Sequence, residues 1–308
     1  ARGPARGRTL FLKPECEGKS MYYAGIDVGG TTVKLGILNE DWKTVWRREI
    51  PTLRGDAEAL SRAIAAALFE SKLPLRAAGI SCAGRVNLVT RRATASNLRW
   101  DSVPFAEHME TALGCPVAID NDIAGALMGE WKLGACAGEK YVLYMALGTG
   151  IGGAFLIDGK PFRGWDNTGG EVGHMVTHAD GLPCVCGGRG CFEQYASAKA
   201  LEQKAGGISA KEVFARVEKG DKAMCDVLDD YVHELVIGIA GLLSVFRPQL
   251  VVIGGGLSLA GEALLSRIRE QLATRCPCLP KQDKPRIVAA SLGNDAGFIG
   301  GAMLAMEM

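Results

Sequence analysis

Residues 22–38, YYAGIDVGGTTVKLGIL, decide how the fold begins. They hold two apolar runs rich in β-branched and aromatic side chains, Tyr22–Val28 and residues 32–38, which are typical of strands. Between the runs stands Gly29-Gly30-Thr31, a turn short enough to close a hairpin. The sequence therefore predicts that the chain opens with a pair of antiparallel strands.

The same pattern returns in the second half of the chain. Residues 141–147 form an apolar run, Gly148-Thr149-Gly150 a turn, and residues 152–157 a returning strand. Leu147 follows Asp27 by 120 positions, which is too long a separation for a solenoid repeat. A chain of 308 residues favours two lobes, and we expect each lobe to open with one of these hairpins beside a shared cleft.

Elsewhere in the chain, expected strands alternate with expected helices. The further strands are residues 44–50, 77–81, 117–120, 249–253 and 287–290. The helices are residues 56–71, Phe105–Leu113, 123–133, 209–219, 221–246, 259–273 and Ala296–Met306. This alternation predicts an α/β fold with a partly parallel sheet.

Composition excludes several classes of protein. The chain is 48% hydrophobic and 22% charged, which is typical of a globular protein, and its net charge of +1 lacks the excess expected of a nucleic-acid coat. Its longest uncharged helical stretch, residues 235–246, is shorter than the roughly 20 residues that span a bilayer. Residues 1–20 are basic and lack a signal-peptide core, so we expect a leader or expression remnant before Met21. A core of this size does not need its ten cysteines as disulfides, which favours a reducing cytoplasm.

Both glycine-containing turns are candidates for binding phosphate. Glycines allow backbone N–H groups to approach phosphate oxygens, and Asp27 at the strand end is suited to a hydrated metal ion. The alternative is an ordinary hairpin with a polar tip. Gly148, Gly150 and Gly153 also match the spacing of a dinucleotide-binding fingerprint, but that fingerprint must open a helix, and residues 154–157 are typical of a strand.

A cluster of metal-ligating residues follows the second hairpin. His174, Cys184, Cys186 and Cys191 supply one imidazole and three thiols within 18 residues, which predicts a Cys3His zinc site. His178 is the alternative imidazole, and dispersed buried cysteines are the alternative to a metal. Four protein ligands leave no open position, so we expect a structural zinc site. Cys276-Pro277-Cys278 lacks such partners and is expected to be a loop with ordinary thiols.

Three polar residues, Asp120-Asn121-Asp122, lie where a predicted strand meets a predicted helix. Open α/β sheets bind ligands at the carboxyl ends of their strands. A helix N-cap would account for Asn121 or Asp122, but not for all three residues. A carboxylate here is suited to act as a general base toward a hydroxyl nucleophile.

From Tyr22 to its C-terminus the chain resembles the ROK (repressor, open reading frame, kinase) family of sugar kinases. Residues 27–31, DVGGT, and 147–153, LGTGIGG, resemble the two phosphate motifs of the family. The zinc signature is matched by residues 169–174, GGEVGH, with CVCG at 184–187 and GCFE at 190–193. Residues 251–256, VVIGGG, resemble the segment on the adenosine side.

The resemblance implies an actin-like ATPase fold of two ribonuclease-H-like lobes around a nucleotide and sugar cleft. It also implies ATP-dependent phosphorylation of a hexose with Mg²⁺, a structural Zn²⁺ and a homodimer. The balanced charge and the lack of a long apolar stretch lead us to expect no nucleic-acid or membrane partner. The small lobe would comprise residues 21–119 with 292–308, and the large lobe residues 120–291 with the zinc loop at 174–191. Asp122 would match the catalytic base.

The resemblance further assigns residues to each substrate. The hexose would contact Gly84, Arg85, Asn97, Asn121, Asp122, Glu171, His174 and Glu193. ATP and Mg²⁺ would contact Asp27, Gly29, Gly30, Thr31, Thr32, Lys34, Gly148, Thr149, Gly150, Gly152, Gly254, Gly255 and Gly256. Zinc would be bound by His174, Cys184, Cys186 and Cys191.

Two departures from the family pattern concern the choice of sugar. Ala124 stands where many members carry Asn, and residues 81–85, SCAGR, are more similar to N-acetylmannosamine kinases than to glucokinases. Glucose is nevertheless the first expectation, then N-acetylmannosamine, then fructose. A sugar-responsive repressor would need a helix-turn-helix before Met21, where 20 residues are too few. A sugar-binding protein without activity is the remaining alternative.

Overall fold

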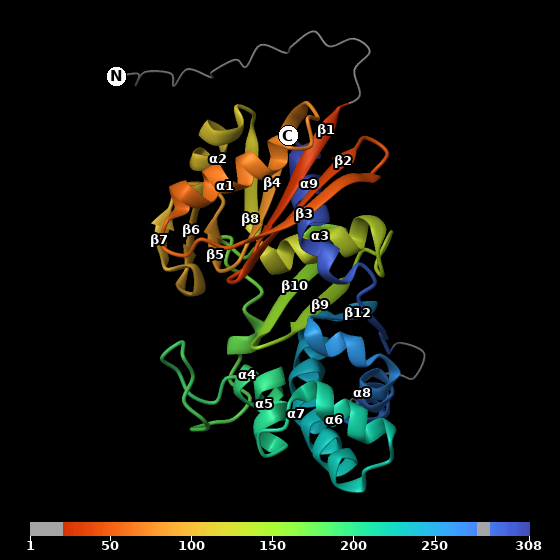
Figure 1. The fold of residues 1–308 in the computed structure, drawn as a ribbon. Helices are drawn as coiled ribbons and strands as arrows, with labels where there is room; N and C mark the ends of the chain where they lie inside the picture. The colour runs from red at the N-terminus through yellow and green to blue at the C-terminus, as the bar shows by residue number, and fades with distance from the viewer. Residues whose placement is uncertain (1–20, 276–283) are drawn as a thin grey trace, which may run out of the picture.

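A computed structural model describes residues 21–275 and 284–308 of the chain. The expected leader at 1–20 and the expected loop at Cys276-Pro277-Cys278 lie outside the described residues. Two five-stranded sheets, one above the other in Figure 1, account for most of the described strands.

The first sheet contains the opening hairpin. Its strands are β1 (Tyr22–Val28), β2 (Thr32–Asn39), β3 (Thr44–Pro51), β4 (Leu75–Cys82) and β8 (Val117–Asn121), in the order β3-β2-β1-β4-β8. The first three strands are antiparallel, whereas β4 and β8 run parallel to β1. Helices α1 (Ala57–Phe69) and α2 (Phe105–Leu113) share a hydrophobic core with this sheet.

The second sheet repeats this arrangement. It consists of β9 (Val142–Leu147), β10 (Ile151–Ile157), β11 (Lys160–Pro161), β12 (Leu250–Gly254) and β13 (Arg286–Ala289), in the order β11-β10-β9-β12-β13. Again the opening hairpin is antiparallel and the later strands are parallel to its first strand. The expectation that each lobe begins with a hairpin is therefore confirmed.

Helices cover the lower side of the second sheet in Figure 1. They are α4 (Glu193–Ala196), α5 (Ala198–Lys204), α6 (Ala210–Glu218), α7 (Lys222–Phe246) and α8 (Glu262–Arg275). The long helix α7 buries a stripe of apolar side chains at steps of three and four, as the sequence predicts. The predicted helix at 259–273 instead begins at Glu262, after a 3₁₀ turn over Gly256–Ala260.

Two helices, α3 (Asp122–Leu133) and α9 (Ala296–Met306), pack against each other, with α3 between the two sheets and α9 along the first sheet (Figure 1). They pack closely because glycines face each other: a Cβ on Gly300 would stand 1.8 Å from the carbonyl oxygen of Gly125. On its other side α9 lies against the first sheet, where a Cβ on Gly79 would stand 1.9 Å from the carbonyl oxygen of Gly301. These close contacts between small residues therefore fix the position of α3, which begins at Asp122, relative to the first sheet.

A buried carboxylate links the two chain segments that run between the sheets. Glu130, fully buried on α3, accepts a hydrogen bond from the backbone N–H of Ala135 at 2.7 Å, in the segment that leads to the second sheet. It also accepts from Ser291 (N at 3.1 Å, Oγ at 3.0 Å) and from Leu292 N at 2.7 Å, in the segment that leads back. The side chain of Glu130 thus hydrogen-bonds to both segments that connect the two sheets.

The sequence missed a small three-stranded sheet, β5 (Arg85–Asn87), β6 (Arg92–Ala95) and β7 (Trp100–Val103), together with β11 and the short helices α4 and α5. These elements are too short for a hydrophobic period to identify them. Among the residues that the structure describes, no helix combines the length and apolarity needed to cross a membrane.

Candidate active site

Three side chains align across the first sheet because of its parallel register. Asp27 on β1 is opposite Ser81 on β4, which in turn is opposite Asp120 on β8. Strand β8 passes directly into α3, so Asn121 and Asp122 project from the carboxyl edge of the sheet. The structure therefore brings the first glycine-containing turn and the Asp120-Asn121-Asp122 segment to the same edge.

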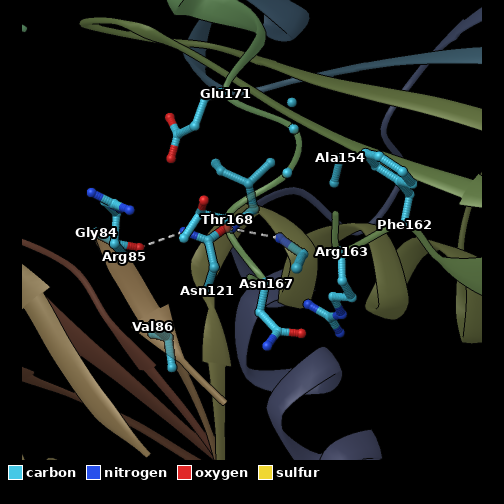
Figure 2. Close-up of a pocket in the computed structure, with 16 residues that line it drawn as sticks. Gly84, Arg85, Val86, Asn121, Ala154, Phe162, Arg163, Asn167, Thr168 and Glu171 are labelled. Carbon is cyan, nitrogen blue, oxygen red and sulfur yellow. Dashed lines mark hydrogen bonds between the residues drawn. The ribbon is translucent and has the colours of Figure 1, made fainter. Parts of the chain in front are cut away.

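Asn121 joins this edge to the start of the helix. Its Oδ1 accepts hydrogen bonds from the backbone N–H groups of Ile123 (2.9 Å) and Ala124 (3.2 Å), which makes it the N-cap of α3. Its Nδ2 donates to the carbonyl oxygen of Gly84 at 2.7 Å and to Oδ1 of Asp122 at 3.0 Å. Figure 2 shows Asn121 between Gly84 and the start of this helix.

Asp122 is a half-buried carboxylate whose proton affinity is high. Burial is the largest cause, and the nearby charge of Asp27 adds to it, so that the pKa of Asp122 rises to about 7. The backbone N–H of Ile123, which donates to Oδ1 at 3.0 Å, acts in the opposite direction, and Glu171 raises the pKa further. A carboxylate with a pKa near neutrality is suited to accept a proton at physiological pH.

Asp27 forms an ion pair with Lys34. Nζ of Lys34 lies 3.6 Å from Oδ2 of Asp27, across the hairpin. Burial raises the pKa of Asp27, and Lys34 lowers it. The carboxylate is also close to α9, because a Cβ on Gly297 would stand 2.5 Å from its carboxyl carbon. Asp27, Lys34 and Asp122 thus belong to one charged group.

The first glycine-containing turn is held by residues outside it. The N–H of Gly29 donates to the carbonyl of Thr32 (3.1 Å), and the hydroxyl of Thr52 donates to the carbonyl of Gly29 (2.8 Å). Arg54, which no sequence pattern indicated, donates to the carbonyl of Gly30 at 2.5 Å and to the hydroxyl of Thr31 at 3.3 Å. Its guanidinium therefore places a positive charge at this turn.

The second and third glycine-containing segments meet each other. At the second turn, the N–H of Gly148 donates to the carbonyl of Gly150 at 3.0 Å. Gly255 has a φ of +76°, which favours glycine, and a Cβ there would stand 2.4 Å from the carbonyl oxygen of Leu147. A Cβ on Gly152 would stand 2.7 Å from a side-chain carbon of Ile123. The predicted nucleotide segments of the second sheet therefore lie together, next to α3.

A pocket opens between the two sheets (Figure 2). Of the predicted sugar-binding residues, Gly84, Arg85, Asn121 and Glu171 line it, and so does Gly152. Arg163, Asn167 and Thr168 line it as well, although no sequence pattern indicated them. They come from the segment between β11 and Glu171, whose place beside β8 depends on tertiary structure.

The other predicted sugar-binding residues lie around this pocket without lining it. Asn97 is next to the first turn, since a Cβ on Gly30 would stand 3.0 Å from its Nδ2. Glu193 lies next to the second turn, where a Cβ on Gly150 would stand 2.7 Å from Oε2. Oε1 of Glu193 is 4.0 Å from Nδ1 of His174. Glu193 therefore stands between the second turn and the cysteine cluster.

The four predicted metal ligands converge. The ligand atoms of His174, Cys184, Cys186 and Cys191 all lie within 4.8 Å of one another. Ligands of a tetrahedral zinc ion at about 2.3 Å from the metal stand roughly 3.8 Å apart, so the cluster has the right size. Sγ of Cys186 and Sγ of Cys191 are 3.6 Å apart, and Sγ of Cys184 is 3.7 Å from Nδ1 of His174.

His178, the alternative imidazole, is used elsewhere. Its ring stacks on Tyr195 with the centroids 3.8 Å apart, and its Nε2 lies 3.4 Å from Oε2 of Glu234 on α7. The hydroxyl of Tyr195 accepts a hydrogen bond from the N–H of Leu182 at 2.6 Å. The histidine of the cluster is therefore His174, and His178 connects the cysteine loop to α7.

Comparison with known proteins agrees with this geometry. A glucokinase of Halalkalibacterium halodurans is 34% identical, over 93% of this chain and 95% of its own. An N-acetyl-D-glucosamine kinase of Shigella flexneri is 30% identical, over 92% of this chain and 99% of its own. The crystal structure of a ROK family glucokinase from Streptomyces griseus in complex with glucose and AMPPNP has a TM-score of 0.80 and 32% identity, covering 93% of this chain and 100% of that one.

Two paired sheets of the same topology, with a site at their facing edges, define a two-lobed α/β protein of the actin-like ATPase type. The model of the ROK family matches residues 23–308. The chain belongs to the ROK family.

Proposed function

We propose that the protein is an ATP-dependent hexose kinase that transfers the γ-phosphoryl group of ATP to a hydroxyl of glucose. The observation that carries this proposal is the position of Asp122. It stands at the start of α3, beside a pocket between two sheets and next to the charged group that includes Asp27 and Lys34. The names of the relatives, glucokinase in several species, support the same activity.

In the proposed mechanism Asp122 accepts the proton of the sugar hydroxyl as that oxygen attacks the γ-phosphorus, and the bond from the γ-phosphorus to the β–γ bridging oxygen breaks to release ADP. Asn121 keeps Asp122 in place by capping the helix and by donating to Oδ1. The two glycine-containing turns offer backbone N–H groups to the phosphates, and Lys34 and Arg54 add positive charge. Mg²⁺ bound with ATP supplies further neutralisation of the transferring group. Asp27 is placed to hold it through water.

The identity of the sugar is tested by a coupled kinase assay with glucose, N-acetylmannosamine, N-acetylglucosamine and fructose. We expect the highest kcat/KM with glucose. N-acetylglucosamine is a second candidate, because relatives at 30% identity bear that name. N-acetylmannosamine and fructose follow from the resemblance. Absence of sugar-dependent ATP consumption with all four would contradict the proposed activity.

We propose zinc as the metal of the cysteine cluster, held by His174, Cys184, Cys186 and Cys191. Three thiols and one imidazole in a closed set are typical of structural zinc. Glu193 contacts both this cluster and the second turn, so the metal would steady one wall of the site. Metal analysis of the purified protein should give one zinc per chain. A Cys184→Ala variant that keeps a full zinc complement would contradict the assignment.

The proposal also includes a homodimer and two lobes that close on substrate, residues 21–119 with 292–308 and residues 120–291. Closure would exclude water and so limit ATP hydrolysis without sugar. The mass in solution, measured by light scattering, should be that of two chains. Small-angle scattering should show a smaller radius of gyration when glucose and an ATP analogue are both present.

A further inference from the structure

An ion pair beside the pocket joins a residue of the first sheet to the segment that follows the second sheet's edge strand. Nη1 of Arg163 donates to Oδ1 of Asp120 at 2.6 Å, and its Nη2 contacts Oδ2 of the same carboxylate. Asp120 is the next-to-last residue of β8 in the first sheet and is 3% exposed. Arg163 follows β11 of the second sheet and lines the pocket. This two-contact pair therefore connects Arg163, which lines the pocket, to the residue that precedes Asn121 in the opposite wall.

On the Arg163 side, the segment that it begins is folded on itself. The N–H of Gly169 donates to the carbonyl of Arg163 at 2.9 Å. The N–H and the hydroxyl of Thr168 both donate to Oδ1 of Asp166, at 3.1 and 2.8 Å. Because these bonds close residues 163–169 into one unit, a shift of Arg163 would carry Thr168, which lines the pocket, with it.

On the Asp120 side, the same carboxylate holds the start of the opposite wall. Oδ1 of Asp120 accepts a hydrogen bond from the N–H of Asn121 at 2.7 Å. Asn121 in turn caps α3, contacts Asp122 and holds the carbonyl of Gly84. The position of the guanidinium is thus connected, through one carboxylate, to Gly84 and Asp122.

Stability alone is a weak reason for such a pair. A buried ion pair contributes little more to the free energy of unfolding than apolar side chains of similar volume would, because both charges lose their hydration. A pair that fixes geometry, in contrast, needs the planar fork of arginine, which binds a carboxylate in one orientation. Here the orientation of the pair matters to the pocket, because Arg163 lines it and Asp120 accepts a hydrogen bond from Asn121, which also lines it.

We propose that Arg163 and Asp120 are a positioning pair that sets the distance between the two walls of the sugar pocket. The pair does not touch the reacting atoms. It acts on the affinity for the sugar and leaves the nucleotide segments in place. This inference rests on the proposed sugar kinase activity and adds two residues to the determinants of sugar binding.

The test compares four variants: Arg163→Gln, Asp120→Asn, the double variant, and Arg163→Lys. We expect Arg163→Gln to raise the KM for glucose by about tenfold or more, since small misplacements in a site cost that much. The KM for ATP should stay within about twofold. The KM for glucose of the double variant should be no higher than that of the more impaired single variant. Arg163→Lys should have a lower KM for glucose than Arg163→Gln, because it keeps the charge.

A control variant removes a second arginine that binds both oxygens of a carboxylate. Arg91 binds Glu110 through two contacts, at 2.7 and 3.3 Å, away from the pocket. Arg91→Gln should lower the melting temperature while leaving the KM for glucose unchanged. A folded Arg163→Gln protein with a KM for glucose within about twofold of wild type, or single effects that add in the double variant, would overturn the proposal.

A second measurement separates this proposal from the proposed activity. Hydrogen exchange of the backbone amides of residues 164–171 in the substrate-free protein should be faster in Arg163→Gln and Asp120→Asn, but not in Arg91→Gln. This result does not require a kinase. If the wild-type protein phosphorylates no sugar, the proposed function fails and exchange alone decides the role of the pair. Unchanged exchange in both variants would overturn that role.

Discussion

Asp122 combines two properties that a catalytic base needs: a position at a pocket and a pKa suited to neutral solution. Burial and the charge of Asp27 give it a pKa of about 7, whereas an ordinary aspartate would be a weaker base. The N-cap bond of Asn121 fixes the start of the helix on which it stands. Among single residues, the proposed proton transfer depends on this carboxylate alone.

The raised pKa predicts a pH dependence. Asp122 accepts a proton only as the carboxylate, so activity is present above its pKa and lost below it. The kcat/KM for the sugar should fall by about tenfold per pH unit below pH 7, since this constant follows ionisation of the free enzyme. A profile of initial rates between about pH 4 and pH 9 measures it. A plateau that continues to about pH 4, the pKa of an ordinary aspartate, would contradict the assignment.

Sequence reasoning found some site residues and missed others for a physical reason. The Asp120-Asn121-Asp122 segment and the four residues of the cysteine cluster stand in local patterns, so their spacing along the chain predicts that they lie together, whereas the choice of Asp122 as the base follows from the resemblance to the ROK family. Arg163 reaches Asp120 from 43 positions away, and Arg54 reaches Gly30 from 24 positions away. Such contacts depend on how the lobes and loops pack, which no local spacing records.

At the level of helices and strands, the packing of α9 against β4 and α3 fixes where α3, and with it Asp122, stands relative to the first sheet. The sequence predicted this helix, Ala296–Met306, from its small residues, but not what they face. Glycines of α9 meet glycines of β4 and α3 at distances that leave no room for a side chain. The short strands β5 to β7 were missed, although the loop between β4 and β5 carries Gly84 to the pocket.

This packing predicts that Gly79→Ala is destabilising. Its Cβ would stand 1.9 Å from the carbonyl oxygen of Gly301, so α9 must shift. Overpacking of this kind costs about 1–3 kcal/mol of unfolding free energy, which thermal and denaturant unfolding measure. Gly241→Ala is the control, because a Cβ there meets nothing within 4 Å and the helix should gain up to about 1 kcal/mol. Equal stability of the two variants would contradict the packing described for α9.

For the whole molecule, the repeated sheet topology explains where the site lies. Each sheet begins with an antiparallel hairpin, and α3 and α9 pack against each other where the two sheets meet. The sequence showed this repetition through its two glycine-containing turns. It did not show Glu130, a buried charge whose partners are distant in sequence and are backbone groups.

Glu130→Gln tests how the lobes are connected. The carboxylate accepts from Ala135, Ser291 and Leu292, and an amide would turn two N–H groups toward these donors. We expect a loss of about 3 kcal/mol or more in unfolding free energy, because buried donors lose a charged partner. Denaturant unfolding of Glu130→Gln and of the exposed control Glu218→Gln measures this. A loss no larger than that of the control would contradict a structural role for Glu130.

The activity of Asp122→Asn tests most directly whether Asp122 takes the proton of the sugar hydroxyl. The amide keeps the shape of the side chain and cannot take a proton, so sugar phosphorylation should fall by about 10²–10⁴-fold. ATP affinity, measured by calorimetry, should remain, and Asp221→Asn at the start of α7 should behave as wild type in both measurements. Near-normal turnover by a folded Asp122→Asn protein would show that another group takes the proton.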